Sequence, residues 1–177
     1  MSRSNDKAAL ATQLVLVTPP LDGARGIEAR LAEALAEGQA AGTPVAAVIA
    51  RMGEGDERAL TNRVKALAPL IQEKGAALMV AGPLDSVARG GADGLHIAYA
   101  PDLLAEAVQR LSPQRMVGVG SLRSRDEAMA AGEAGADYVM FGEPFRPKGE
   151  EADRWPPFAS VVERVGWWAD LFQVPEI

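Results

Sequence analysis

The chain has 177 residues, with 18 Lys and Arg against 24 Asp and Glu, and a formal net charge of −6. It has no Cys and one His, which excludes a disulfide framework, a thiolate nucleophile and a metal site built on a His pair. The acidic balance and the 5% aromatic content disfavour nucleic-acid binding. No apolar run approaches the roughly 20 residues that span a bilayer, and the polar start leads into no signal-peptide core. We therefore expect a cytoplasmic protein with a polar tail (1–12) and one domain (13–177).

Short apolar runs alternate with longer amphipathic segments along the whole chain. The first run ends at Pro19, and the amphipathic segment after it ends at Gly42. Asp56 is placed to cap the second helix, and Ser124 with Glu127 forms a capping box before the fifth. The expected strands are 14–17, 45–49, 77–80, 94–97, 116–119 and 137–141. The expected helices cover 27–41, 57–74, 84–88, 103–111 and 158–172, and a further helix opens at the capping box 124–127.

This order is β-α repeated six times, which is typical of parallel strands with right-handed crossovers. Either a (β/α) barrel or an open doubly wound sheet fits the pattern. Because a complete (β/α)8 barrel needs at least about 200 residues, this chain is two units short of one. The fold class that we predict is α/β, an incomplete TIM-type barrel of about six βα units.

Ligands of parallel α/β folds bind at the carboxyl ends of the strands, so the loops after each strand hold the candidate residues. Arg51 follows the second strand, where it can clamp an anion or pair with a nearby carboxylate. Gly120 and Ser121, followed by Arg123, precede a helix N-terminus that suits a phosphate. Tight packing of a strand against a helix explains the same glycines equally well.

Three further groups are candidates in or near these loops. Glu143 and Lys148, after the sixth strand, can hold a cation and a phosphate or can simply be solvated. Asp85 and Asp102 can place carboxylates for Mg2+ but also suit helix N-termini. His96 lies within an apolar strand, where a hydrogen-bonded core residue is more typical than a catalyst.

From Gln13 to Gly142 the sequence resembles the thiamine phosphate synthase/TenI family of (β/α)8 barrels. The resemblance is carried by two segments and a linking motif: Gly91-Ala92-Asp93-Gly94-Leu95-His96, Gly135-Ala136-Asp137-Tyr138, and Gly118-Val119-Gly120-Ser121. It implies a transferase that joins a pyrimidine methyl diphosphate to a thiazole phosphate with the help of Mg2+. Positive side chains and a divalent cation would then stabilise the departing pyrophosphate.

The loops at which the family holds its diphosphate depart from the family pattern. Of the family's Gln-x-Arg-x-Lys only Arg51 persists, and its Asn-Asp reads Ala81-Gly82. Asp102 stands one place late for the second carboxylate, and the family's serine reads Gly120 with Ser121 beside it. The resemblance thus predicts Mg2+ as a possible cofactor whose expected ligand positions are lost.

Two hypotheses follow for the function. The first is a thiamine phosphate synthase-like protein that binds a phosphorylated thiazole or pyrimidine, with the family's transferase activity weak or lost. The second is a non-catalytic binding or assembly protein, a homo-oligomer joined through open barrel edges, with apolar area at Trp167, Trp168 and Phe172 to be covered. A phosphosugar isomerase-type barrel is disfavoured, because no Glu/His/Lys set matches that chemistry.

Overall fold

The computed structural model describes residues 13–22, 24–142, 158–171 and 174–175. Within them, one sheet of six parallel strands has the order β1-β2-β3-β4-β5-β6. The strands are β1 (Leu14–Val17), β2 (Val45–Arg51), β3 (Ala77–Ala81), β4 (Gly94–Ala98), β5 (Met116–Gly120) and β6 (Tyr138–Val139). The helices are α1 (Ile27–Ala40), α2 (Glu57–Gln72), α3 (Leu84–Gly90), α4 (Pro101–Leu111), α5 (Arg125–Glu133) and α6 (Phe158–Leu171).

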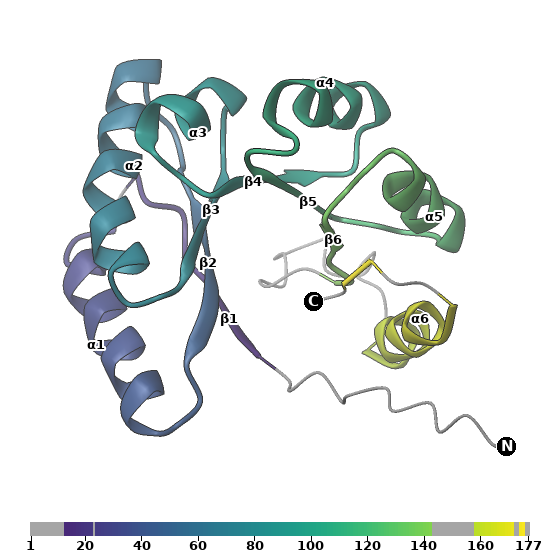
Figure 1. Ribbon diagram of the computed structural model, residues 1–177, viewed down its shortest axis with the longest axis horizontal. Coiled ribbons are helices and arrows are strands. Elements are labelled where there is room, and N and C mark those ends of the chain that lie inside the picture. Colours follow the sequence, from purple (N-terminus) through teal and green to yellow (C-terminus); the bar gives the residue numbers. More distant parts are fainter. Residues whose placement is uncertain (1–12, 23, 143–157, 172–173, 176–177) are drawn as a thin grey trace, which may run out of the picture.

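The sheet curves into an open part of a barrel. In Figure 1 the strands follow one another around an arch, and α1 to α5 cover its convex side. Among the described residues β1 pairs with β2 alone, so the barrel is not closed through β1. The predicted fold class, an incomplete TIM-type barrel of six βα units, is confirmed.

The starts of α2 and α5 follow the predicted capping chemistry. Asp56 Oδ1 accepts a hydrogen bond from the Ala59 N–H at 2.7 Å, and Ser124 Oγ accepts from Glu127 N–H at 3.1 Å. The Glu127 carboxylate reaches back to the Arg123 N–H at 2.6 Å. Each side chain thereby satisfies a backbone donor that a helix end otherwise leaves free.

Alternate residues of β1, β2, β3 and β6 enter two separate apolar clusters, whereas β4 and β5 contribute to the convex one alone. The convex cluster, packed under the helices, includes Val48, Leu78, Leu95, Val117 and Val139. The concave cluster contains Ile49, Met79, Tyr138 and Met140, with Val15, Val17, Ala47 and Ala81 packed against it. Because both faces of β1, β2, β3 and β6 are apolar, these strands appear in sequence as continuous hydrophobic runs.

Two aspartates join the amino ends of neighbouring strands by hydrogen bonds. Asp93 Oδ2 accepts from the Leu78 N–H at 2.7 Å, and the Asp93 N–H donates to the Leu78 carbonyl at 2.9 Å. Asp137 makes the same two bonds to Val117, at 2.7 and 2.8 Å. The glycine two residues before each aspartate has a φ of +80° or +96°, which ends the preceding helix. The Gly-Ala-Asp segments that carry the family resemblance therefore join neighbouring strands at their amino ends.

Helix α6 packs beside β6 and α5 (Figure 1) and buries one of its two tryptophans. Trp168 is fully buried, contacts Phe141 edge-on at 5.9 Å, and donates from Nε1 to the Val174 carbonyl at 2.7 Å. Trp168 therefore offers no apolar area for a partner, contrary to the expectation from sequence, and Phe172 lies outside the described residues. The sixth strand is shorter than predicted, although the Met140 N–H still donates to the Val119 carbonyl at 2.8 Å.

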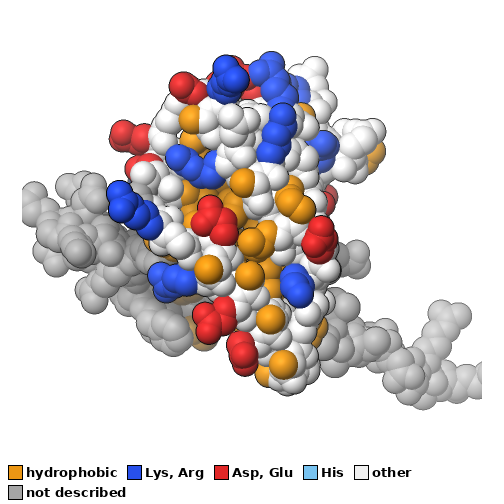
Figure 2. All heavy atoms as spheres, turned by 90° about the vertical axis from the view of Figure 1, so that its left-hand side faces the viewer, with side chains coloured by type: hydrophobic (Ala, Val, Ile, Leu, Met, Phe, Trp, Pro, Cys, Tyr) orange, Lys and Arg blue, Asp and Glu red, His pale blue; other side chains and the backbone are white. Residues whose placement is uncertain are grey.

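The outer face over α1 and α2 is that of a solvated helical layer. Figure 2 shows positive and negative side chains interspersed there with small apolar groups. No helix in the described part of the chain has the length and apolarity to cross a membrane.

Candidate functional site

The candidate site lies on the concave face, where the carboxyl ends of the strands open. Strand register places five residues in one row across the sheet. Arg51 stands beside Ala81, His96 beside Gly118, and Gly118 beside Tyr138. Ala81 neighbours His96, because the preceding residues of β3 and β4 pair with each other. With strands about 4.8 Å apart, Arg51 and His96 are about 10 Å apart along this row.

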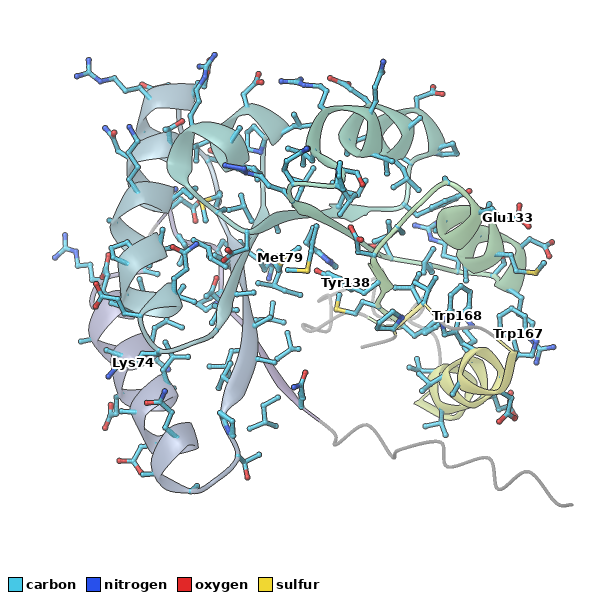
Figure 3. The ribbon with its side chains drawn as sticks, viewed as in Figure 1. Lys74, Met79, Glu133, Tyr138, Trp167 and Trp168 are labelled. Atoms are coloured by element: carbon cyan, nitrogen blue, oxygen red, sulfur yellow. The ribbon has the colours of Figure 1, made fainter. Side chains whose placement is uncertain are left out.

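The floor of the concave face is apolar. Ile49, Met79, Tyr138 and Met140 are each at most 7% exposed. In Figure 3 the side chains of Met79 and Tyr138 both point into the space enclosed by the arch. Such a surface suits the flat apolar part of a ligand better than a charged one.

His96 and Tyr138 form a hydrogen-bonded, stacked pair on this floor. His96 Nδ1 lies 2.8 Å from the Tyr138 hydroxyl, and the ring centroids are 5.7 Å apart with an interplanar angle of 14°. Burial lowers the pKa of His96 to about 4 and raises the pKa of Tyr138 above its usual range. Both side chains are therefore uncharged at neutral pH.

Two glycines of β5 make room for these rings. A Cβ at Gly118 would overlap the Tyr138 ring, and a Cβ at Gly120 would lie 2.8 Å from His96 Nε2. Both glycines are buried within the strand. Gly118 and Gly120 therefore leave the space that the rings of Tyr138 and His96 occupy. Neither interpretation made from the sequence, a phosphate-binding turn or close packing of a strand against a helix, included this role.

Arg51 ends β2 at the carboxyl edge of the concave face. Its backbone N–H donates to the Thr18 hydroxyl at 3.0 Å, and its carbonyl accepts from the Leu21 N–H at 2.9 Å. The guanidinium of Arg63 binds the carbonyl of the next residue, Met52. These bonds fix the end of β2, and the half-buried Arg51 is the last residue of that strand.

The second predicted anion group, after β5, is only partly assembled. Ser121 adopts a left-handed φ of +57°, which turns the chain away from β5. Arg123 is exposed, and its N–H is already bound by the Glu127 carboxylate. The Arg125 guanidinium lies over the Trp167 ring, 4.9 Å from its centroid. Cation–π contact therefore draws Arg125 toward α6.

The described residues do not fit a magnesium diphosphate site. Asp85 pairs with Arg110 of α4, and Asp102 is exposed in the first turn of that helix. No group of three or more His, Asp or Glu side chains gathers within the described ranges. Glu143 and Lys148 lie outside those ranges, so their predicted roles stay predictions.

The sequence did not reveal the partner of the lone histidine. Tyr138 stands out in the sequence only as part of a family motif, and it lies 42 residues from His96 along the chain. The signal in the sequence that could have found this partner is the alternation of side chains along a strand. Tyr138 lies on the same face of the predicted sixth strand as Met140, and His96 lies on the same face of β4 as Gly94.

A family model and the curated relatives indicate one family. The model of a family described as thiamine monophosphate synthase matches residues 14–175. The thiamine-phosphate synthase of Rhodospirillum centenum is 34% identical over 163 residues, covering 92% of this chain and 74% of that protein. Its counterpart in Erythrobacter litoralis is 31% identical over 166 residues, covering 94% of this chain and 75% of that protein.

A solved structure supports the fold independently. The thiamine phosphate pyrophosphorylase from Pyrococcus furiosus superposes with a TM-score of 0.70, covering 93% of this chain and 72% of that one. Because the two sequences are only 21% identical, this superposition shows similarity of fold alone. The chain spans about three quarters of the length of each of these relatives.

Proposed function

The chain belongs to the thiamine monophosphate synthase/TenI family, and from this premise we propose that it binds a phosphorylated thiazole or pyrimidine at the concave face. We propose further that the family's transferase activity is weak or lost in this chain. The row from Arg51 to His96 carries the proposal. It sets a cation at one end, an uncharged polar ring at the other, and the small side chain of Ala81 between them.

The arrangement divides the ligand into two parts. Arg51 binds the phosphate, for which the planar guanidinium offers paired donors. The heterocycle lies over Ala81 and His96, against the apolar floor that keeps water from its faces. The phosphate is proposed to be surrounded further by Ser121, Arg123 and Lys148. Glu143 is proposed as the acidic residue of the same group.

The loss of transferase activity is inferred from the loops after β3 and β4. Ala81 and Gly82 carry no side-chain oxygen where the resemblance leads us to expect one, and Asp102 is exposed on α4. Mg2+ binds through oxygen ligands, so a diphosphate has no metal held by these residues. What the site retains is binding and orientation of one phosphorylated heterocycle.

Calorimetric titration with a thiazole phosphate tests the binding proposal. We expect wild-type protein to bind it and Arg51→Ala to weaken binding by about 10-fold or more, the strength of a charged hydrogen bond. Lys74→Ala is the matched control, since this cation lies at the other end of the sheet (Figure 3). Absence of binding at millimolar concentration, both of the thiazole phosphate and of a phosphorylated pyrimidine titrated in the same way, would refute the proposal.

A turnover assay tests the second part. Purified protein with Mg2+, the pyrimidine diphosphate and the thiazole phosphate is expected to yield little or no thiamine monophosphate. Sustained turnover at a rate comparable with the curated relatives would show that other residues hold the metal.

The open edge of β1 favours an assembly role as the alternative. This strand pairs with β2 alone among the described residues, and Leu14 on it is 45% exposed. The opposite edge is partly covered, because the Val139 N–H donates to the Pro175 carbonyl at 2.9 Å. An unpaired strand is a template for another chain, so the proposed partner is a second copy. Light scattering that finds only monomers at micromolar concentration would remove this alternative.

A further inference from the structure

The direction of the hydrogen bond between Tyr138 and His96 can be deduced from what each group needs. Within the described residues, the buried Tyr138 hydroxyl makes one hydrogen bond, and its partner is His96 Nδ1. If Nδ1 carried the proton and donated, the hydroxyl proton would have no acceptor there, and a buried unmade hydrogen bond is costly. The hydroxyl therefore donates to Nδ1, and the single proton of the neutral imidazole is on Nε2.

The other imidazole nitrogen faces the open end of the site. Nε2 lies over Gly120, the last residue of β5, at 2.8 Å from where a Cβ would stand. In the part of the chain that the structure describes, no hydrogen bond to Nε2 is found. A polar N–H set on an apolar floor without a partner is a group for a ligand to satisfy.

We propose that Tyr138 is a positioning residue that holds His96 in the Nε2–H tautomer, so that His96 donates a hydrogen bond to an acceptor atom in the ring of the bound heterocycle. The ligand's identity rests on the proposed function, whereas the tautomer does not. Tyr138 would thus make His96 select rings with an acceptor, such as a ring nitrogen, at this place.

The surroundings favour an uncharged acceptor over a phosphate. The floor of the concave face holds Met79, Met140 and Ile49, none of which stabilises an anion. A phosphate there would have to protonate the imidazole against its burial, or remain without a cation. Arg51, two strands away in the same row, offers the phosphate a permanent charge.

The presence of one histidine in the chain makes the tautomer directly measurable. In tag-free protein labelled with 15N at histidine, long-range 1H–15N spectra distinguish a protonated from an unprotonated ring nitrogen. We expect wild-type His96 to show a protonated Nε2 and an unprotonated Nδ1. A proton on Nδ1 would overturn the proposal without any variant.

The chain's two tyrosines supply a variant and its control. Tyr138→Phe keeps the ring over Gly118 but removes the hydroxyl, so both nitrogens of His96 should shift toward an exchanging mixture of tautomers. Tyr99→Phe, at a half-buried tyrosine with no bond to His96, should leave the wild-type spectrum. A pure Nε2–H signal in Tyr138→Phe would overturn the positioning role even if stability had changed.

Three probes then test the ligand: the thiazole phosphate, its unphosphorylated alcohol and inorganic phosphate. Both thiazoles should move the Nε2–H resonance while phosphate alone should not, and Tyr138→Phe should weaken thiazole binding by about 3- to 10-fold. A resonance that responds to phosphate alone would overturn the assignment of this position to the ring. If neither thiazole binds, thiazole binding and the ring contact to a thiazole fail together, while the tautomer spectra still decide the role of Tyr138.

Discussion

Adding one methyl group at Gly118 should destabilise the protein, although glycine is an unfavourable residue in a strand. The Cβ of alanine would overlap Cζ, Cε1 and the hydroxyl of Tyr138. That ring is 7% exposed and is bonded to His96, so moving it away from the added methyl group breaks this hydrogen bond. Overpacking of a core costs about 1–3 kcal/mol, and loss of the hydroxyl–imidazole bond adds about 1 kcal/mol. We therefore expect Gly118→Ala to lose about 2–4 kcal/mol of unfolding free energy.

A double-mutant cycle isolates the contact responsible. Tyr138→Val costs stability by itself, because a large buried side chain is shortened. In that background the added methyl group enters vacated space, so combining Gly118→Ala with Tyr138→Val should cost close to nothing beyond Tyr138→Val alone. Urea unfolding followed by circular dichroism gives all four free energies.

Gly166→Ala serves as the control for glycine chemistry. Gly166 lies inside α6 with nothing within 4 Å of an added Cβ, so alanine there should gain about 0.5–1 kcal/mol. If Gly118→Ala leaves the urea midpoint unchanged, the Tyr138 ring does not depend on the absence of a side chain at Gly118. The same conclusion follows if the substitution costs the same with and without the Tyr138 ring.

Further outcomes follow from other contacts. Asp93→Ala and Asp137→Ala should each cost about 1.5–3 kcal/mol in urea unfolding, because each removes a charged acceptor from a strand N–H; a loss below about 0.5 kcal/mol would contradict their role in joining the strands. The pKa of His96 is about 4 in the folded chain and 6.5 unfolded, so only the unfolded chain takes up this proton between those values. Stability conferred by the neutral imidazole is then complete above about pH 6.5 and falls by up to about 3 kcal/mol as the pH drops toward 4. His96→Gln should remove that component of the pH dependence, and an unchanged profile would refute it. Trp168→Phe loses the bond to the Val174 carbonyl and should cost about 1–2 kcal/mol by thermal unfolding, whereas an unchanged melting temperature would show that the indole N–H is dispensable.

Local signals in the sequence were sufficient for the order and type of the elements. Asp56 and Ser124 cap the helices that they were predicted to cap, and the six strands begin within one residue of their predicted starts. Both features depend on neighbours within a few residues, since a cap acts over one helical turn and a strand is recognised by its own apolar run.

The floor of the site could not be predicted in the same way, because it depends on register between distant strands. His96 meets Tyr138 only when β4, β5 and β6 are aligned with Gly118 between them. A pair of glycines before a helix also looks like a phosphate turn to any local rule. What distinguishes the two is the size of the side chain on the next strand, and that is a property of the assembled sheet.

The amino ends of the strands stabilise the sheet and the carboxyl ends contact ligands. This difference explains why the family resemblance predicts the fold more strongly than the activity. The Gly-Ala-Asp segments lie at the amino ends of the strands, where Asp93 and Asp137 bind backbone of the preceding strand. Residues at that end stabilise a barrel, whereas those at the carboxyl ends contact ligands. Ala81 and Gly120 stand at the carboxyl ends, where the resemblance leads us to expect polar side chains instead. Because the aspartate bonds lie at the amino ends, the loops around Arg51 can change their chemistry while the aspartates keep the sheet in register. The activity of this chain must therefore be established from the residues of its own concave face.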